Sequence, residues 1–276
     1  MSHLLRIALC VTFGTACART VVPGNGRDGG DGGLVRGDGS LGDAIGAGFV
    51  AVHADPNTGS SIGAAFWRGG TRDTYQDCRI EEIGACVIAD CDPLLRIAAT
   101  LALAGTIQAG GATVDAIAGT YTLGDARVLW LPGDSIEIRA TGGHATPGIP
   151  IVPAFSGTVV LPQPLGTTSL AATTDPLQVS RNRAFAVQWM PTGSQVLATI
   201  RQSLPRAVSV SCVFDGQSGA GEIPAEAIAE LEPSGSAGNP STVLLTPISR
   251  RTLTAGGYEV LLEASGVGAA ASAIVR

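Results

Sequence analysis

Short apolar segments alternate with turn residues along most of the chain. Segments 48–54 and 61–67 are both apolar, and Asp-Pro-Asn-Thr-Gly at 55–59 separates them as a strong turn signal, so we predict a hairpin. Ile136 and Ile138 alternate with charged residues, the period of two that marks a strand with one buried face. This rhythm is typical of antiparallel sheets rather than of a parallel α/β fold. We predict further strands at 99–110, 113–123, 155–161, 185–189, 208–214 and 258–263.

One segment has a clear helical pattern. Residues 223–231 place Pro224 in the first turn and bring Ile228 and Leu231 to one side. Segment 94–104 is ambiguous, because the Asp-Pro pair before it suits the start of a helix while its neighbours are strands; we favour a strand.

The segment 162–166, Pro-Gln-Pro-Leu-Gly, predicts a domain boundary. A chain of 276 residues is long enough for two domains. We therefore predict a mainly all-β protein with two antiparallel β-sandwich domains, Ig-like or jelly-roll-like. The first is an N-terminal β-sandwich over 44–163, and the second is a C-terminal Ig-like β-sandwich over 167–276 that carries one short helix.

The N-terminus has the features of an export leader. Arg6 precedes an apolar run over 7–16, which is too short to span a bilayer because a span needs roughly 20 residues. Gly-Thr-Ala-Cys, ending at Cys17, partly matches a bacterial lipobox, while Ala-Cys-Ala at 16–18 offers an ordinary secretory cleavage site. Residues 18–43 form a Gly/Asp-rich tether, which favours lipidation of Cys17. We predict a signal peptide and lipobox over 1–17, and a lipid anchor as the contact with the membrane.

Composition narrows the classes of function. The formal net charge is −6, which disfavours nucleic acid as a partner. All 17 basic residues are Arg, so mechanisms that need a lysine, such as Schiff-base chemistry, are excluded. Aromatic residues are only 4% of the chain, so the apolar cores are built from Ala, Val, Leu and Ile.

Four cysteines of the mature chain are disulfide candidates: Cys78, Cys86, Cys91 and Cys212. If 85–91 is a strand, Cys86 and Cys91 point to opposite faces about 16 Å apart, whereas a disulfide needs Cα atoms within about 7 Å. A hairpin that places Cys78 beside Cys86 is our preferred bridge, and a loop that folds back would instead join Cys78 to Cys91. Cys91 and Cys212 are then either joined to each other or separately reduced. The spacings do not match a zinc knuckle, so we predict no metal site.

Gly216-Gln-Ser-Gly-Ala follows a predicted strand and precedes the predicted helix, which is the context of a hydrolase nucleophile elbow with Ser218 as nucleophile. That elbow needs a later histidine, but His53 and His144 both precede it, so we favour a flexible loop. His144 with Asp134 could form a base or metal pair, although a solvated loop histidine is the favoured interpretation. His53 alternates with Val50 and Val52 and is expected to face solvent.

Other candidates for chemistry have ordinary explanations. The acidic pairs Glu81/Glu82 and Asp90/Asp92 suit glycoside hydrolysis only at the right separation, and acidic pairs are common on an acidic surface. Asp28 and Asp31 of the tether do not continue a calcium-binding repeat. Three tryptophans would stack on sugar rings if exposed, but each lies in an apolar segment where burial is expected: Trp67, Trp130 and Trp189.

The order of several short motifs resembles that of uncharacterised predicted myxobacterial envelope lipoproteins. The resemblance spans most of the mature chain and implies an envelope lipoprotein without supplying an activity. It rests on the cysteines at 78, 86 and 91, then on the segments 104–107, 119–121, 129–130, 133–134, 140–143, 153–155, 185–189, 210–212, 223–225 and 255–257.

Together these observations predict an exported, lipid-anchored envelope protein with a structural or binding role. We expect it at the outer membrane or facing the periplasm, or otherwise secreted. Candidate partners besides the membrane are envelope polysaccharide or protein, and we predict no cofactor and no enzymatic activity. The alternatives are a carbohydrate-binding module and, less favoured, a secreted serine hydrolase.

Overall fold

The structure, a computed structural model, describes residues 46–68, 74–75, 78–91, 100–117, 119–145, 147–170, 175–202, 207–234 and 241–276. The predicted leader, the lipidation site Cys17 and the tether lie outside these residues, as does most of the ambiguous segment 94–104. Within the described residues the protein is mostly β, as the alternating pattern predicts.

The largest sheet among the described residues has 14 strands, which come from both halves of the described sequence. Its main path runs in the order β3 (Thr74–Tyr75), β4 (Cys78–Ile83), β5 (Cys86–Cys91), β16 (Ala207–Phe214), β15 (Gln195–Arg201), β18 (Ser241–Ala255), β19 (Tyr258–Ser265), β1 (Gly46–Asp55), β2 (Gly59–Arg68), β10 (Thr120–Asp125) and β9 (Ala116–Ile117). Three strands lie off this path: β13 (Leu177–Val179), β20 (Ala269–Val275) and β6 (Thr100–Leu101).

Two small sheets and a short helix complete the described fold. One sheet has the order β12 (Phe155–Val160), β11 (Ser135–Ala140), β7 (Ile107–Ala109) and β8 (Ala112–Val114), and the other pairs β14 (Phe185–Gln188) with β17 (Ala220–Ile223). The helix α2 (Ala225–Ala229) is shorter than predicted, but it buries Ile228 and is followed by the buried Leu231 as expected.

The predicted strand positions and their alternating burial are confirmed for strands that have one face in solvent. The hairpin of β1 and β2 pairs Asp55 with Gly59 around the predicted turn. In β11 the two isoleucines are buried and the charged residues between them are exposed. In β16, by contrast, residues 208–212 are buried on both faces: Val208, Val210 and Cys212 pack in the second core, and Ser209 and Ser211 on the other face are also buried.

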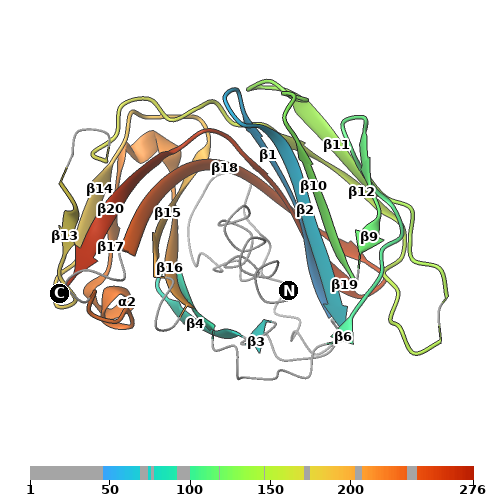
Figure 1. Ribbon diagram of the computed structural model, residues 1–276, viewed down its shortest axis with the longest axis horizontal. Helices are drawn as coiled ribbons and strands as arrows, with labels where there is room; N and C mark the ends of the chain where they lie inside the picture. Colours follow the sequence, from blue (N-terminus) through green and yellow to red (C-terminus); the bar gives the residue numbers. More distant parts are fainter. Residues whose placement is uncertain are drawn as a thin grey trace, which may run out of the picture.

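The structure has two main apolar cores, and each takes strands from both halves of the sequence. The first core lies between the four-stranded sheet and the β1, β2 and β19 part of the large sheet. The second lies between β14, β17 and α2 on one side and β5, β15, β16 and β18 on the other. Figure 1 shows the two lobes, with β18 arching from one to the other.

The strand pairing does not follow the predicted division at 162–166. β1 pairs in parallel with β19 over Gly46↔Tyr258 to His53↔Ser265, and β5 pairs with β16. The 15-residue strand β18 contributes Val243 and Leu245 to the second core, and Leu253 and Ala255 to the first. The two sandwiches therefore share one continuous sheet, since edge strands from each half find their partners in the other.

The opposite face of the large sheet carries a third apolar cluster. Phe49 and Trp67 lie on β1 and β2, Leu261 on β19, and Ile80 and Val87 on β4 and β5. Because β4 and β5 are far from β1 and β2 in the strand order, the sheet must curl to bring them into one cluster. We call this inward-facing surface the concave face; Figure 1 shows β3 and β4 curving toward the end of the arch that β2 occupies.

Candidate functional site

One disulfide between described residues joins Cys86 to Cys212, two residues 126 positions apart in sequence. They lie opposite one another in the β5–β16 ladder and are both buried in the second core. The preferred Cys78–Cys86 bridge is therefore wrong. The reason is local: Gly84 has a positive φ of 62°, which permits a tight turn that pairs Ile83 with Cys86 and moves Cys78 away from Cys86.

The same register accounts for the other cysteines of the hairpin. Cys78 lies opposite Cys91 in the β4–β5 ladder, and Cys91 is also disulfide-bonded. The rejected Cys86–Cys91 bridge is absent, as the opposite faces of a strand require. Among the described cysteines, Cys86 and Cys91 thus project to opposite sides of the large sheet.

Ser218 has no nucleophile-elbow geometry. It ends a 3₁₀ turn, η2 (Gly216–Ser218), that connects β16 to the edge strand β17. Its hydroxyl lies 2.6 Å from the carbonyl oxygen of Asp215 and 2.7 Å from that of Ala220. The serine therefore closes a turn, which agrees with the loop interpretation and removes the motif on which a serine hydrolase was considered.

The exposure of His144 agrees with the favoured interpretation of a solvated loop histidine, whereas that of His53 does not agree with its expectation. His144 is exposed, and Asp134 uses its carboxylate to accept a hydrogen bond from the backbone N–H of Leu131 at 2.7 Å, which closes a turn. His53 is half-buried on the concave face instead of facing solvent, with Nδ1 3.1 Å from both the carbonyl and the hydroxyl oxygen of Ser265. The expectation for His53 is wrong because β1 is covered on both faces.

The acidic pairs are separated by the strand geometry. Glu81 and Glu82 are successive exposed residues of β4 and so point to opposite faces, and Glu81 accepts from Arg79 at 3.2 Å. Asp90 follows on β5, whereas Asp92 lies outside the described residues. No group of three or more His, Cys, Asp and Glu side chains within the described ranges is placed to hold a metal ion.

All three tryptophans are buried. Trp67, Trp130 and Trp189 are 6%, 4% and 4% exposed. Trp189 donates its indole N–H to the carbonyl oxygen of Gly216 at 2.8 Å and stacks at a tilt on Phe214. These side chains pack in the apolar clusters, so they offer no exposed surface on which sugar rings could stack.

The concave face carries a buried ion pair that sequence reasoning did not find. Arg250 of β18 donates from Nε to Oε2 of Glu263 at 2.8 Å, and the two residues face each other in the β18–β19 ladder. Their side chains are only 13% and 3% exposed. Burial lowers the pKa of Arg250 to about 10, so the guanidinium stays charged at neutral pH. No sequence signal singles this pair out, because its members meet only through strand pairing.

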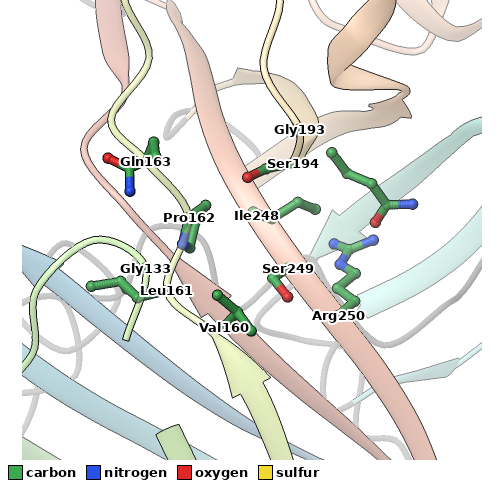
Figure 2. A pocket seen from close by; sticks show the side chains of 11 residues that line it. Gly133, Val160, Leu161, Pro162, Gln163, Gly193, Ser194, Ile248, Ser249 and Arg250 are labelled. Atoms are coloured by element: carbon green, nitrogen blue, oxygen red, sulfur yellow. The ribbon is translucent and has the colours of Figure 1, made fainter. Parts of the chain in front are cut away.

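Arg250 also lines a pocket at the junction of the two lobes, which we call the junction pocket. It has a volume of roughly 450 Å³, within the usual range for small-molecule sites. Residues 160–163, which cross between the lobes, form one wall (Figure 2). Residues 193–195 at the start of β15, residues 248–250 of β18 and Gly133 complete the lining.

The position of the junction pocket follows from where strand pairing stops. β15 pairs with β18 over Thr242 to Ile248 and contributes no partner to the residues that follow. β18 continues beyond that point paired to β19 on its other side. The pocket therefore lies where β18 no longer pairs with β15, beside the chain segment that links the lobes.

The lining of the junction pocket combines apolar walls with hydrogen-bonding side chains. Val160, Leu161 and Ile248 supply apolar surface, and the polar residues are Gln163, Ser194, Gln195, Ser249 and Arg250. Such a mixture is typical of pockets that bind small polar molecules.

No protein-family model matches the chain. A search of the curated proteins also found no match. None of the helices in the described part of the chain has the length and apolarity needed to cross a membrane.

Proposed function

We propose that this protein is an exported envelope protein, anchored by a lipid on Cys17, that acts by binding a small polar molecule in the junction pocket. The observation that carries the export part of the proposal is the Cys86–Cys212 disulfide. Disulfides persist in oxidising compartments, whereas cytosolic thiols are kept reduced. The leader-like residues 1–17 and the Gly/Asp-rich residues 18–43 agree with this location.

The binding part of the proposal is supported by the junction pocket and by what the alternatives lack. Ser218 closes a turn with its hydroxyl, and the tryptophans that would favour a carbohydrate-binding module are buried. The junction pocket, by contrast, gathers five polar residues around a cavity of suitable size.

The export part is tested by expressing the full chain in a Gram-negative host, separating the cell fractions and determining the mass of the N-terminal peptide. We expect a chain that begins at Cys17, carries a diacylglyceryl group and is found with the membranes. Cys17→Ser should abolish lipidation, while Cys10→Ser within the leader serves as the matched control and should leave it intact. A full-length chain in the cytosol with all its thiols reduced would contradict the proposal.

A further inference from the structure

The guanidinium of Arg250 is held from one side only. Its Nε donates to Glu263, and this is the contact that the structure gives this side chain. A guanidinium has five N–H donors, so the four on its two Nη atoms have no acceptor among the described residues. The side chain is 13% exposed and belongs to the lining of the junction pocket.

Glu263 orients the guanidinium by binding Nε. This contact leaves the edge between the two Nη atoms available, and that edge matches the two oxygens of a planar oxyanion. Fixing a fork in advance lowers the entropy lost when a ligand binds. The ion pair thus presents a preorganised donor edge at the junction pocket.

The surrounding side chains also have unused hydrogen-bonding capacity. Gln163, Ser194, Gln195 and Ser249 line the same pocket, and none of their side chains has a hydrogen-bond partner within the described residues. Amide and hydroxyl groups both donate and accept, so they suit the polar remainder of a small ligand.

We propose, on the basis of the function proposed above, that the junction pocket binds a small molecule through an oxyanion group, a carboxylate or phosphate, held by the Nη edge of Arg250. The amides of Gln163 and Gln195 and the hydroxyl of Ser194 contact the rest of the ligand, whereas Ser249 projects from the face of β18 opposite to Arg250. The apolar walls limit its size, since the cavity is roughly 450 Å³.

The negative charge of Glu263 offsets the positive charge of Arg250, so the pair attracts an anion only weakly through its net charge. Most of the binding free energy of a ligand oxyanion must therefore come from directed hydrogen bonds to the guanidinium. This makes a specific prediction: lysine at position 250 keeps the positive charge opposite Glu263 but lacks the planar fork, so it should not replace arginine.

The test uses the full chain, purified in detergent with its disulfides intact, and saturation-transfer NMR of three probes. Succinate represents a carboxylate, methyl phosphate represents a phosphate, and succinamide is the uncharged match of succinate. We expect saturable binding of succinate or methyl phosphate in the millimolar range and none of succinamide. The oxyanion that binds more tightly identifies the class.

Arg250→Lys should weaken that binding at least tenfold, while Arg251→Gln should change it less than twofold. Arg251 is the next residue of β18, is exposed and lies outside the pocket lining. Circular dichroism and a thiol assay establish that each variant is folded and oxidised.

Gln163→Glu provides a variant that leaves the buried ion pair intact, in case Arg250→Lys does not fold. It adds a negative charge, which has the same sign as the ligand oxyanion, at the exposed rim of the junction pocket. This change should weaken binding of the oxyanion at least fivefold. Gln178→Glu makes the same change at an exposed position of β13, outside the pocket, and should have no such effect.

Three results would overturn the assignment: no saturable binding of either oxyanion to the folded protein, equal binding of succinamide, or undiminished binding by folded Arg250→Lys. These outcomes are separate from those of the export experiment. A lipidated chain without oxyanion binding refutes the ligand class alone, whereas an unprocessed cytosolic chain refutes the envelope location.

Discussion

The Cys86–Cys212 disulfide should contribute a large share of the stability of the oxidised protein. The bond closes a loop of 126 residues and connects the β4–β5 hairpin of the first half of the sequence to β16 of the second half. The perturbation we propose is the double variant Cys86→Ala/Cys212→Ala. Removing both residues avoids leaving a single thiol that is free to exchange.

The magnitude follows from the length of the closed loop. With a sequence separation of 126, the chain-entropy relation gives about 5 kcal/mol at 25 °C as the stabilisation that the cross-link provides by restricting the unfolded chain. Measured values for disulfides usually fall between about 2 and 4 kcal/mol, so we expect a loss within about 2–5 kcal/mol. With a urea m-value of about 2.5 kcal/mol/M, the unfolding midpoint should fall by roughly 1–2 M.

The assay is urea unfolding followed by circular dichroism, performed on both proteins with and without a reductant. Without reductant the double variant should unfold at the lower urea concentration. With reductant the wild type also lacks the bond, so the difference between the two proteins should shrink to the cost of replacing two buried side chains. A non-reducing peptide map of the wild type should contain the Cys86–Cys212 pair, and the strand register predicts Cys78–Cys91 as well.

Two results would refute this reasoning. Equal unfolding midpoints of the oxidised proteins would show that the bond does not restrict the unfolded chain as calculated. A difference that persists at full size under reductant would show that the stability came from side-chain packing in the second core and not from the cross-link.

Three further perturbations test other parts of the structure. Glu263→Gln breaks the buried ion pair and should lower the free energy of unfolding by about 3–5 kcal/mol in the same urea assay; a loss below about 1 kcal/mol would contradict burial of the pair. Gly216→Ala should cost about 1–3 kcal/mol, because a Cβ atom there would overlap a backbone oxygen of a neighbouring loop, whereas Gly124→Ala has open space and should cost less than about 0.5 kcal/mol. Hydrogen bonds from the side chain and backbone of Arg127 lower the pKa of Asp125 to about 2, so this interaction favours folding above about pH 4 and its contribution is lost as the pH falls toward 2. In Arg127→Gln, an NMR titration should find the pKa of Asp125 nearer its ordinary value of 3.8, and an unchanged pKa near 2 would contradict the assignment.

The outcome for the cysteine hairpin shows how far local sequence reasoning extends. The exclusion of a Cys86–Cys91 bond needed only the two-residue period of a strand, and it holds in the structure. The choice between partners for Cys86 depended on the register of the hairpin and on which strand joins its other edge. A one-residue change in the position of the turn alters every pairing, and the approach of β16 is invisible in the sequence around Cys86.

The sequence by itself determined the β class, the hairpin of β1 and β2, the alternation in β11 and the short helix near residue 225, because period, turn residues and proline act over a few neighbouring positions. Only the tertiary structure decided that β1 pairs with β19, that Cys86 meets Cys212, and that Arg250 lines the junction pocket. Those contacts depend on which strands, distant in sequence, pair along their edges and pack their apolar faces together. Many such pairings satisfy the same local pattern, and the packing of the complete cores selects among them.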